Sequence, residues 1–219
     1  MHLERLSIGY KSSAPIVTSI DAELLPATFT CLIGRNGTGK STLLMTLAGQ
    51  LAPLHGHIIY NKEEQHPALV LPKMPELTNT TVRELVAYGR LPYTGLFGKL
   101  NVSDYEAADA AIERLGIKSI ASKYTHQISD GERQKALIAR GLAQGSSILL
   151  LDEPSAFLDY PSRRQLMEQL QLLAHSEGKI ILLSTHDVEL ATNYADKLWL
   201  IQDKKLIEKA PQDFSPAEL

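Results

Sequence analysis

The segment 34–42, with the letters GRNGTGKST, constrains the fold of this chain more than any other part of its sequence. It fits the pattern G-x-x-x-x-G-K-[ST], which forms a phosphate-binding loop when it joins a strand to a helix. That context is present, because the β-prone run 28–33 precedes it and Leu43, Leu44 and Leu47 follow at helical spacing. The sequence therefore predicts a nucleoside triphosphate site. A glycine-rich turn with a solvated lysine is the alternative, which this context disfavours.

Each residue type in this segment has a role at a phosphate. Glycines let the backbone wrap around the phosphate without Cβ clashes, and successive N–H groups form an anion nest at a helix N-terminus. Lys40 would reach the β- and γ-phosphates, and the hydroxyl of Ser41 would be a ligand of Mg²⁺. The candidate ATP-binding residues of the loop are Gly34, Asn36, Gly37, Thr38, Gly39, Lys40, Ser41 and Thr42.

Strands and helices alternate along the chain. Residues 16–24 alternate in the manner of a half-exposed strand, whereas 147–152 and 179–185 contain continuous apolar runs typical of buried parallel strands. Pro161 can open a helix between these two runs. This order predicts an α/β fold.

The middle of the chain differs, because residues from about 75 to 144 show helices and loops without a convincing strand. One expected helix runs from Ser103 to Leu115, with Ser103 as its N-cap. We interpret this part as a helical subdomain inserted into the α/β core. The predicted organisation is one domain, 1–219, with its core in about 1–74 and 145–219.

Carboxylates and a histidine follow the two buried strands. The letters ILLLDEP end in Asp152, a candidate Mg²⁺ ligand, and Glu153, which is placed to polarise the water that attacks the γ-phosphate. His186 follows the next strand and can donate to a γ-phosphate oxygen and orient Glu153. Two exposed acids that merely end a strand, and a structural histidine, are the alternatives. Ligands bind at the carboxyl ends of strands in open α/β sheets, which favours the functional interpretation.

A second candidate anion site opens the helical run 136–143. The letters ISDGERQK place Ser129 where it can cap that helix. One phosphate needs only one nest, so a second nest about ninety positions after the first suggests two chains, each facing the nucleotide of the other. An ordinary serine N-cap is the alternative.

These motifs, in this order, resemble the ATP-binding subunit of an ABC transporter. GRNGTGKST resembles the Walker A loop, ISDGERQ the signature, ILLLDEP the Walker B strand, SAFLD the D-loop and STHD the H-loop. The resemblance implies a P-loop NTPase core with an antiparallel β subdomain, and a homodimer holding two ATP molecules with Mg²⁺. It also implies that Ser129 and Gly131 contact the partner's ATP and that Asp159 lies across the interface. Tyr10 matches the aromatic residue that stacks on adenine, although a tyrosine ending an edge strand fits the sequence as well.

Within this family, YGRLPYTGLFGKL and EAADAAIERLG resemble the ATPases of importers for iron-siderophores, haem and cobalamin. The resemblance implies a polytopic permease dimer as partner, an indirectly acting substrate-binding protein, and a peripheral location on the cytoplasmic face of the membrane. The chain itself offers no span, since its longest apolar runs hold four residues and a span needs about 20. Its formal net charge of −3 argues against nucleic acid as a partner.

Two positions depart from the family pattern. The first of two expected signature glycines is Asp130, which is tolerable if it points away or pairs with Arg133. Lys73 occupies the position of the Q-loop glutamine, after the letters LVLP. A protonated lysine cannot be an Mg²⁺ ligand, so either the coupling of ATP to motion differs here or the register is shifted and Lys73 faces solvent.

Two other functions compete with the importer ATPase. A soluble ABC ATPase that acts on a protein assembly would keep the same nucleotide chemistry. A small-molecule kinase would also use the loop at 34–42, but it would not explain the signature, the D-loop and His186 together.

Overall fold

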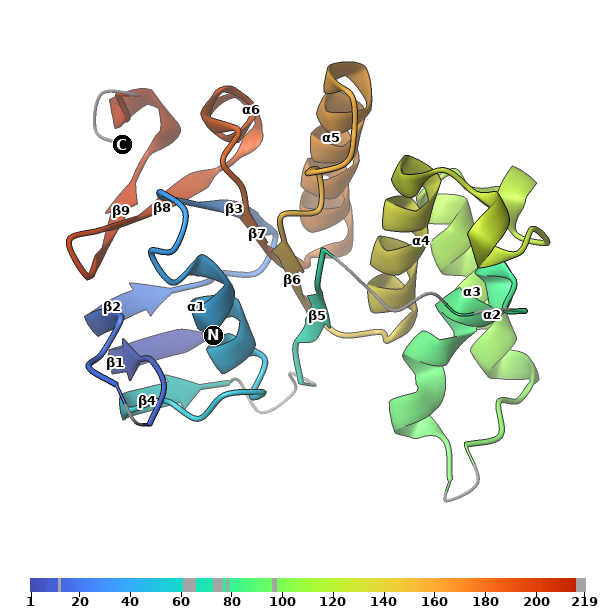
Figure 1. Cartoon of the computed structure of the whole chain (residues 1–219), viewed down its shortest axis with the longest axis horizontal. Coiled ribbons are helices and arrows are strands. Elements are labelled where there is room, and N and C mark those ends of the chain that lie inside the picture. The colour runs from blue at the N-terminus through green and yellow to red at the C-terminus, as the bar shows by residue number, and fades with distance from the viewer. Residues whose placement is uncertain (12, 61–65, 73–76, 78, 96–97, 216–219) are drawn as a thin grey trace.

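The computed structural model describes residues 1–11, 13–60, 66–72, 77, 79–95 and 98–215. Two sheets and an all-helical part make up the fold, with the sheets at one end of the molecule and the helical part at the other (Figure 1). The predicted mixed α/β class is confirmed. Among the residues that the structure describes, no helix combines the length and the apolar character needed to cross a membrane.

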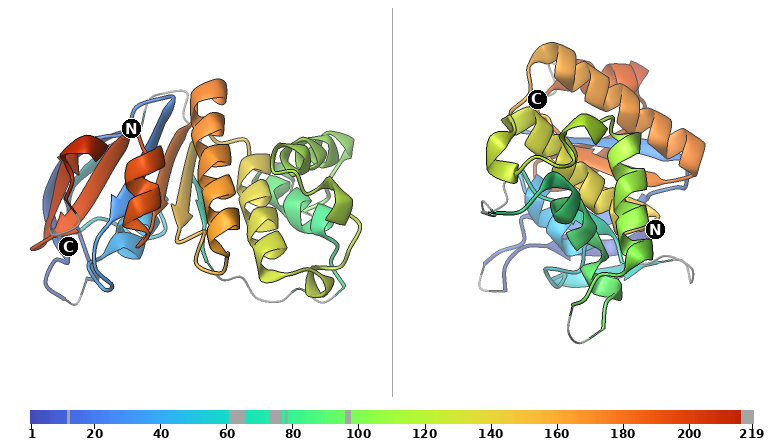
Figure 2. Two further views of the ribbon diagram at one scale, coloured as in Figure 1. Left: turned by 90° about the horizontal axis from the view of Figure 1, so that it is seen from above. Right: turned by 90° about the vertical axis from the view of Figure 1, so that its right-hand side faces the viewer.

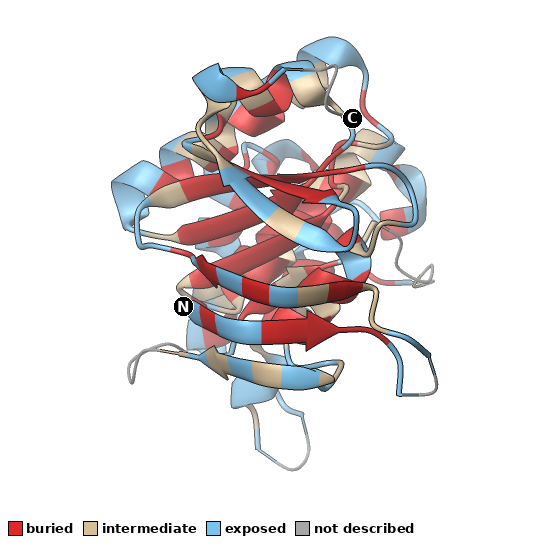
Figure 3. Ribbon diagram, turned by 90° about the vertical axis from the view of Figure 1, so that its left-hand side faces the viewer, coloured by how far each residue is buried: buried red, intermediate tan, exposed pale blue. Residues whose placement is uncertain are grey.

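The smaller sheet is antiparallel, in the order β2 (Val17–Glu23), β1 (His2–Ile8) and β4 (His55–Ile59). Figure 3 shows buried and exposed residues alternating along β2 of this sheet. This is the pattern of a sheet with one face in water. It provides the antiparallel subdomain that the resemblance implies.

The larger sheet has six strands and carries the predicted buried runs. Its order is β5 (Ala68–Val70), β6 (Ile148–Asp152), β7 (Ile180–Ser184), β3 (Thr28–Ile33), β8 (Lys197–Gln202) and β9 (Lys205–Lys209). All neighbouring pairs are parallel except β8 and β9. The phosphate-loop strand β3 therefore lies next to β7, and β6 lies on the other side of β7. This order brings the candidate residues at the ends of β3, β6 and β7 to one edge.

Alternate residues of β6 enter two different cores. Ile148 and Leu150 pack with residues of α1 (Lys40–Leu47) and of the antiparallel sheet. Leu149 and Leu151 belong to the other core, which contains residues of α5 (Tyr160–Glu177) and α6 (Val188–Tyr194). Full burial of one such side chain contributes about 1.5–3 kcal/mol, so both faces of this sheet stabilise the fold.

The helical part comprises α2 (Val82–Ala87), η1 (Tyr88–Tyr93), α3 (Val102–Arg114), η2 (Lys118–Ile120), η3 (Thr125–Gln127) and α4 (Asp130–Ala143). The prediction for α3 was wrong at its start, because Asn101 and not Ser103 is the N-cap. Asn101 accepts from the N–H of Asp104, and the Asp104 carboxylate accepts from the N–H of Asn101. This reciprocal pair satisfies two helix-end donors, which a cap at Ser103 would leave unpaired.

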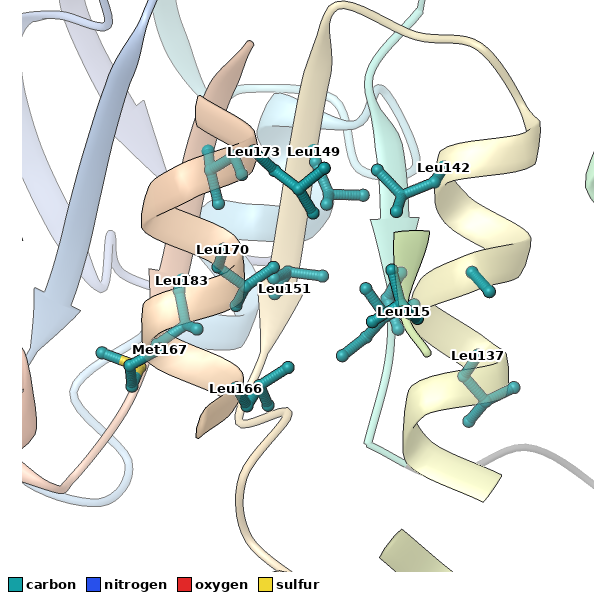
Figure 4. Close-up of a cluster of buried hydrophobic side chains, with 14 of the residues drawn as sticks. Leu115, Leu137, Leu142, Leu149, Leu151, Leu166, Met167, Leu170, Leu173 and Leu183 are labelled. Atoms are coloured by element: carbon teal, nitrogen blue, oxygen red, sulfur yellow. The ribbon is translucent and has the colours of Figure 1, made fainter. Parts of the chain in front are cut away.

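Helix α4 joins the helical part to the larger sheet (Figure 2). Leu137 and Leu142 on α4 share one core with Leu149 on β6 and Leu170 on α5 (Figure 4). The approach is close at Gly141, where a Cβ atom would lie 2.8 Å from Cγ2 of Val70. Helix α4, which begins at the signature, is thus packed directly on the sheet that carries the nucleotide residues. A last short helix, η4 (Pro211–Asp213), follows β9.

Candidate nucleotide-binding and hydrolysis site

The loop 34–39 turns the chain from β3 into α1, and its backbone admits only glycine at two places. Gly39, the N-cap of α1, has φ 106°, and a Cβ atom there would lie 2.6 Å from Cγ2 of Ile16. At Gly34 a Cβ atom would lie 2.9 Å from the carbonyl oxygen of Ile201. The left-handed backbone and the close packing explain both glycines physically. As predicted, the loop lies between a strand and a helix.

Lys40 lies folded into this loop and is 6% exposed. Its Nζ donates to the carbonyl oxygens of Gly34, at 2.8 Å, and Arg35, at 3.2 Å, and lies 4.0 Å from Oε1 of Glu153. Burial lowers the pKa of Lys40, while the carboxylates of Glu153 and Asp152 act in the opposite direction. A buried cation held by neutral carbonyls is available to an anionic ligand.

A cleft of about 450 Å³ opens beside the loop. This volume lies within the range of small-molecule sites. Tyr10 stands at its edge with half of its surface exposed, in keeping with either interpretation of that residue. The lining residues are Tyr10, Ile16, Asn36, Gly37, Gly39, Lys40, Ser41, Thr42 and Glu153.

One serine of the neighbouring strand binds both acidic residues at the end of β6, Asp152 through its carboxylate and Glu153 through its backbone. Asp152 and Ser184 are register partners on β6 and β7. Oγ of Ser184 donates to Oδ1 of Asp152 at 2.6 Å and accepts from the N–H of Glu153 at 2.9 Å. The carbonyl oxygen of Ser184 accepts from the same N–H at 3.2 Å. Ser184 is fully buried, and sequence reasoning did not single it out.

Glu153 has a strained backbone, with φ 44°. A residue other than glycine in this left-handed region costs on the order of 1–3 kcal/mol. The N–H of Glu153 donates to Ser184, which holds the strained backbone in place, and the Glu153 side chain lines the cleft. Its Oε2 lies 3.1 Å from Nδ1 of His186, so the predicted proximity of these two side chains is present.

Two oxygen-bearing side chains are candidate ligands of Mg²⁺, which prefers oxygen ligands. Ser41 offers a hydroxyl in the cleft and Asp152 offers a carboxylate at the strand end. No group of three or more acidic, histidine or cysteine residues that could hold a metal occurs among the described residues. Mg²⁺ in nucleotide sites is commonly bound by one or two protein oxygens together with substrate phosphates. A hydroxyl and a carboxylate fit that mode.

The signature residues lie on a different cleft. Ser129 caps α4: its Oγ accepts from the N–H of Glu132 at 3.3 Å and donates to Oε2 of Glu132 at 2.9 Å. The backbone N–H of Ser129 also donates to Oε2 of Glu132, at 2.9 Å. The hydrogen bonds that the Glu132 carboxylate accepts from Ser129, chiefly the one from this N–H, lower the pKa of Glu132. Ser129 and Gly131 line a separate cleft of about 220 Å³ that includes Leu158. The structure therefore does not bring them into the cleft of the phosphate loop.

The two unusual positions have different outcomes. Asp130 is exposed, and its Oδ1 lies 3.8 Å from Nη1 of Arg133, so the predicted pairing is present. Lys73 lies outside the described residues, and the prediction made for it stays a prediction.

Asp159 is the N-cap of α5 and accepts from the N–H of Ser162 at 3.0 Å. Its hydrogen bonds with Ser162 lower the pKa of its carboxyl. The contact of Asp159 with a second chain stays a prediction.

Comparison with known proteins places these features in a family. The family model described as ABC transporter matches residues 17–156. An uncharacterized ABC transporter ATP-binding protein of Methanocaldococcus jannaschii is 38% identical over 214 residues, covering 93% of this chain and 73% of that protein. The ferric enterobactin transport ATP-binding protein of Escherichia coli is 36% identical, covering 99% and 83%. The iron(3+)-hydroxamate import ATP-binding protein of Bacillus subtilis is 33% identical, covering 94% and 80%.

Solved structures share the fold. A transporter described as of metal-chelate type, in an inward-facing conformation, matches with a TM-score of 0.89 at 26% identity, covering 99% of this chain and 85% of that one. A bacterial ABC transporter cassette solved as a dimer matches with a TM-score of 0.80 at 21% identity, covering 97% and 99%.

Proposed function

Since this chain belongs to the ABC transporter family of ATP-binding proteins, we propose that it is the ATP-hydrolysing subunit of an importer. The cargo would be a metal chelate of the iron-siderophore, haem or cobalamin class, and it would pass through a separate membrane permease. Relatives named for ferric enterobactin, iron(3+)-hydroxamate and cobalamin import support this class. The segments 88–100 and 106–116 carry the letters that resemble the ATPases of such importers.

One observation carries the hydrolytic part of the proposal: Lys40 and Glu153 line a single cleft, and the His186 side chain contacts Glu153. Lys40 would release its two carbonyl partners and bind the β- and γ-phosphates. Glu153 would accept a proton from a water whose oxygen attacks the γ-phosphorus as the bond to the β,γ-bridging oxygen breaks. His186 would hold Glu153 in place, from the 3.1 Å that separates their side chains. Free phosphate and ADP are the products.

Ser41 and Asp152 would hold Mg²⁺, which, when bound, neutralises charge on the phosphate oxygens. Lys40 and the N–H groups of the loop add their own positive potential around the same oxygens. The protein's contribution to the reaction is therefore positioning and electrostatics, with no covalent intermediate on the chain.

A second copy of the chain would complete the site. The signature cleft, with Ser129 and Gly131, is separate from the phosphate-loop cleft of the same chain. We propose a head-to-tail homodimer with two ATP molecules, in which Asp159 and the signature of each chain face the nucleotide of the other. ATP binding would close this dimer and hydrolysis would reopen it. The motion would pass to a permease dimer at the cytoplasmic face of the membrane, with a substrate-binding protein acting indirectly.

The first experiment identifies the partner. Tagged protein is purified from its native cells in mild detergent, and co-purifying proteins are identified by mass spectrometry. We expect a polytopic membrane protein in equal stoichiometry. A soluble assembly in its place would refute the importer and favour the soluble ABC ATPase, while transfer of phosphate to a small acceptor would favour a kinase.

A further inference from the structure

Arg163, in the first turn of α5, connects two segments that are far apart in sequence. Its Nε donates to the carbonyl oxygen of Leu158 at 2.8 Å, and its Nη1 lies 3.6 Å from Oδ2 of Asp187. The side chains of Arg163 and Asp187 are only 29% and 15% exposed. A guanidinium presents its donors in a fixed fork, so both contacts constrain its position at once.

The first contact fixes the end of the segment that leads away from Glu153. This segment, residues 153–158, is a pair of tight turns in which Ala156 donates to the carbonyl oxygen of Glu153 and Leu158 to that of Ser155. Leu158 is buried against the signature: a Cβ atom on Gly131 would lie 2.9 Å from its Cδ2. Arg163 therefore holds the residue on which the signature glycine packs.

The second contact fixes the residue that follows His186. Asp187 is the N-cap of α6, and its Oδ1 accepts from the N–H of Leu190 at 3.2 Å while Oδ2 faces Arg163. The backbone beside His186 is thus held from two sides, by the helix cap and by Arg163. His186 in turn lies 3.1 Å from Glu153.

We propose that Arg163 is a positioning residue for hydrolysis. It fastens the segment 153–158 to the segment that carries His186, and so keeps His186 against the Glu153 carboxylate. The inference rests on the proposed ATPase function, because it assigns a role to the pair of Glu153 and His186. Arg163 is not among the described residues that line the phosphate-loop cleft, so it would act through Asp187 and Leu158.

The test uses two substitutions that spare the surrounding structure. Arg163→Gln removes the cation, and Asp187→Asn removes the anion but keeps a helix cap, since Asn caps as well as Asp. Arg164→Gln is the matched control: Arg164 is the adjacent residue on α5 and is 63% exposed. It pairs with Glu168 and donates to the hydroxyl of Tyr194, at the opposite end of α6 from Asp187. ATP hydrolysis, the KM for ATP, the thermal midpoint and the NMR signal of the His186 ring are measured for each variant and for the double variant.

We expect kcat to fall roughly tenfold in Arg163→Gln and in Asp187→Asn, because small displacements of catalytic groups have effects of this order. The KM for ATP should stay within about twofold, since the phosphate loop is untouched. The double variant should fall no further than either single variant. The His186 signal should move in both variants and not in Arg164→Gln.

Equal kcat in Arg163→Gln and Arg164→Gln would overturn the proposed role, as would losses that multiply in the double variant. Phosphate release by the wild-type protein tests the proposed function separately. A wild-type protein that releases no phosphate from ATP would refute the ATPase function itself. If the wild-type protein hydrolyses ATP and the Arg163→Gln substitution leaves kcat unchanged, only the positioning role would be refuted.

Discussion

The phosphate-loop half of the site and the signature half are built differently. In the first, the key polar groups are buried, with Lys40 6%, Asp152 5% and Ser184 0% exposed. Asp152 and Ser184 end the parallel strands β6 and β7, and Lys40 begins α1. In the second, Ser129 is exposed at a helix N-terminus, and its capping bonds go to Glu132 of the same helix. The sheet fixes the geometry of the phosphate-loop half. In the signature half, the polar groups of Ser129 and Glu132 bond to each other until a ligand replaces these bonds.

This difference implies that the two halves contribute to different steps of the reaction cycle. Within one chain, a buried cation can bind a phosphate, and fixed carboxylates can hold a metal ion and a water molecule beside it. The N-terminus of α4 has N–H groups that can bind an anion, but it has no buried charge. It would therefore stabilise a phosphate only when a second chain brings that phosphate to it. Variants on the two halves should therefore affect different steps of the cycle.

The largest effect is expected for Glu153→Gln in the phosphate-loop half. The amide keeps the shape and the cleft but cannot accept the proton of the attacking water, so hydrolysis should fall on the order of 100-fold or more. ATP affinity should change little. Phosphate release and binding of a fluorescent ATP analogue measure the two quantities on the same protein.

Lys40→Met is the companion variant for that experiment. It should lose ATP affinity itself, because it removes the buried cation of the loop. Hydrolysis by Glu153→Gln at a near wild-type rate would disprove the role given to Glu153.

Gly131→Val should be the next largest effect, and it acts on the signature half. A Cβ atom at Gly131 would lie 2.9 Å from Cδ2 of Leu158, so a branched side chain must displace Leu158 from the cleft. We expect turnover to drop by roughly 10- to 100-fold, while a single chain binds ATP with wild-type affinity. Light scattering with ATP should show the loss of dimer. A variant that dimerises and hydrolyses normally would contradict the two-chain site.

The sequence predicted the strand–loop–helix arrangement of the phosphate-loop half, because the signals for that arrangement are local. The glycines, Lys40 and the flanking strand and helix are contiguous, and the acids follow a four-residue apolar run. The role of Ser184 could not be predicted from local sequence. It depends on the parallel register that pairs Asp152 with Ser184, 32 positions away, and a register between distant strands is set by tertiary packing.

The signature half shows the same limit. The capping role of Ser129 follows from local sequence. The packing of Gly131 on Leu158 and the link through Arg163 to Asp187 appear only in three dimensions. At α3 the local signal was present and was misread. Both Asn101 and Ser103 are good cap types, and the acid at Asp104, three residues after Asn101, decides between them.

Ser184→Ala should give a smaller effect in the phosphate-loop half. It leaves an oxygen of Asp152 and the strained N–H of Glu153 with fewer partners, at a cost of about 1–3 kcal/mol in the free energy of unfolding. We expect kcat to fall about tenfold and the Mg²⁺ concentration needed for nucleotide binding to rise.

Ser146→Ala is its matched control, since Ser146 is also buried and accepts from the N–H of Ile148 at the other end of β6. It should lose similar stability, measured by urea unfolding, with unchanged turnover. Equal turnover in the two variants would mean that Ser184 contributes only to stability.

The smallest effect is expected for Asp130→Asn. Asp130 is 72% exposed and pairs with Arg133 at 3.8 Å, an arrangement worth only about 0–1 kcal/mol. Its negative charge stabilises the N-terminus of α4 by a similar small amount, so the variant should unfold slightly more easily. The same charge repels an incoming phosphate, and its removal should lower the ATP concentration for dimer closure by about two- to threefold. Glu113→Gln, an exposed acid paired with Lys118, is the control for a general change in charge. Because both effects are electrostatic, they should shrink together as salt is raised, and a shift that persists in high salt would show that Asp130 acts through packing instead.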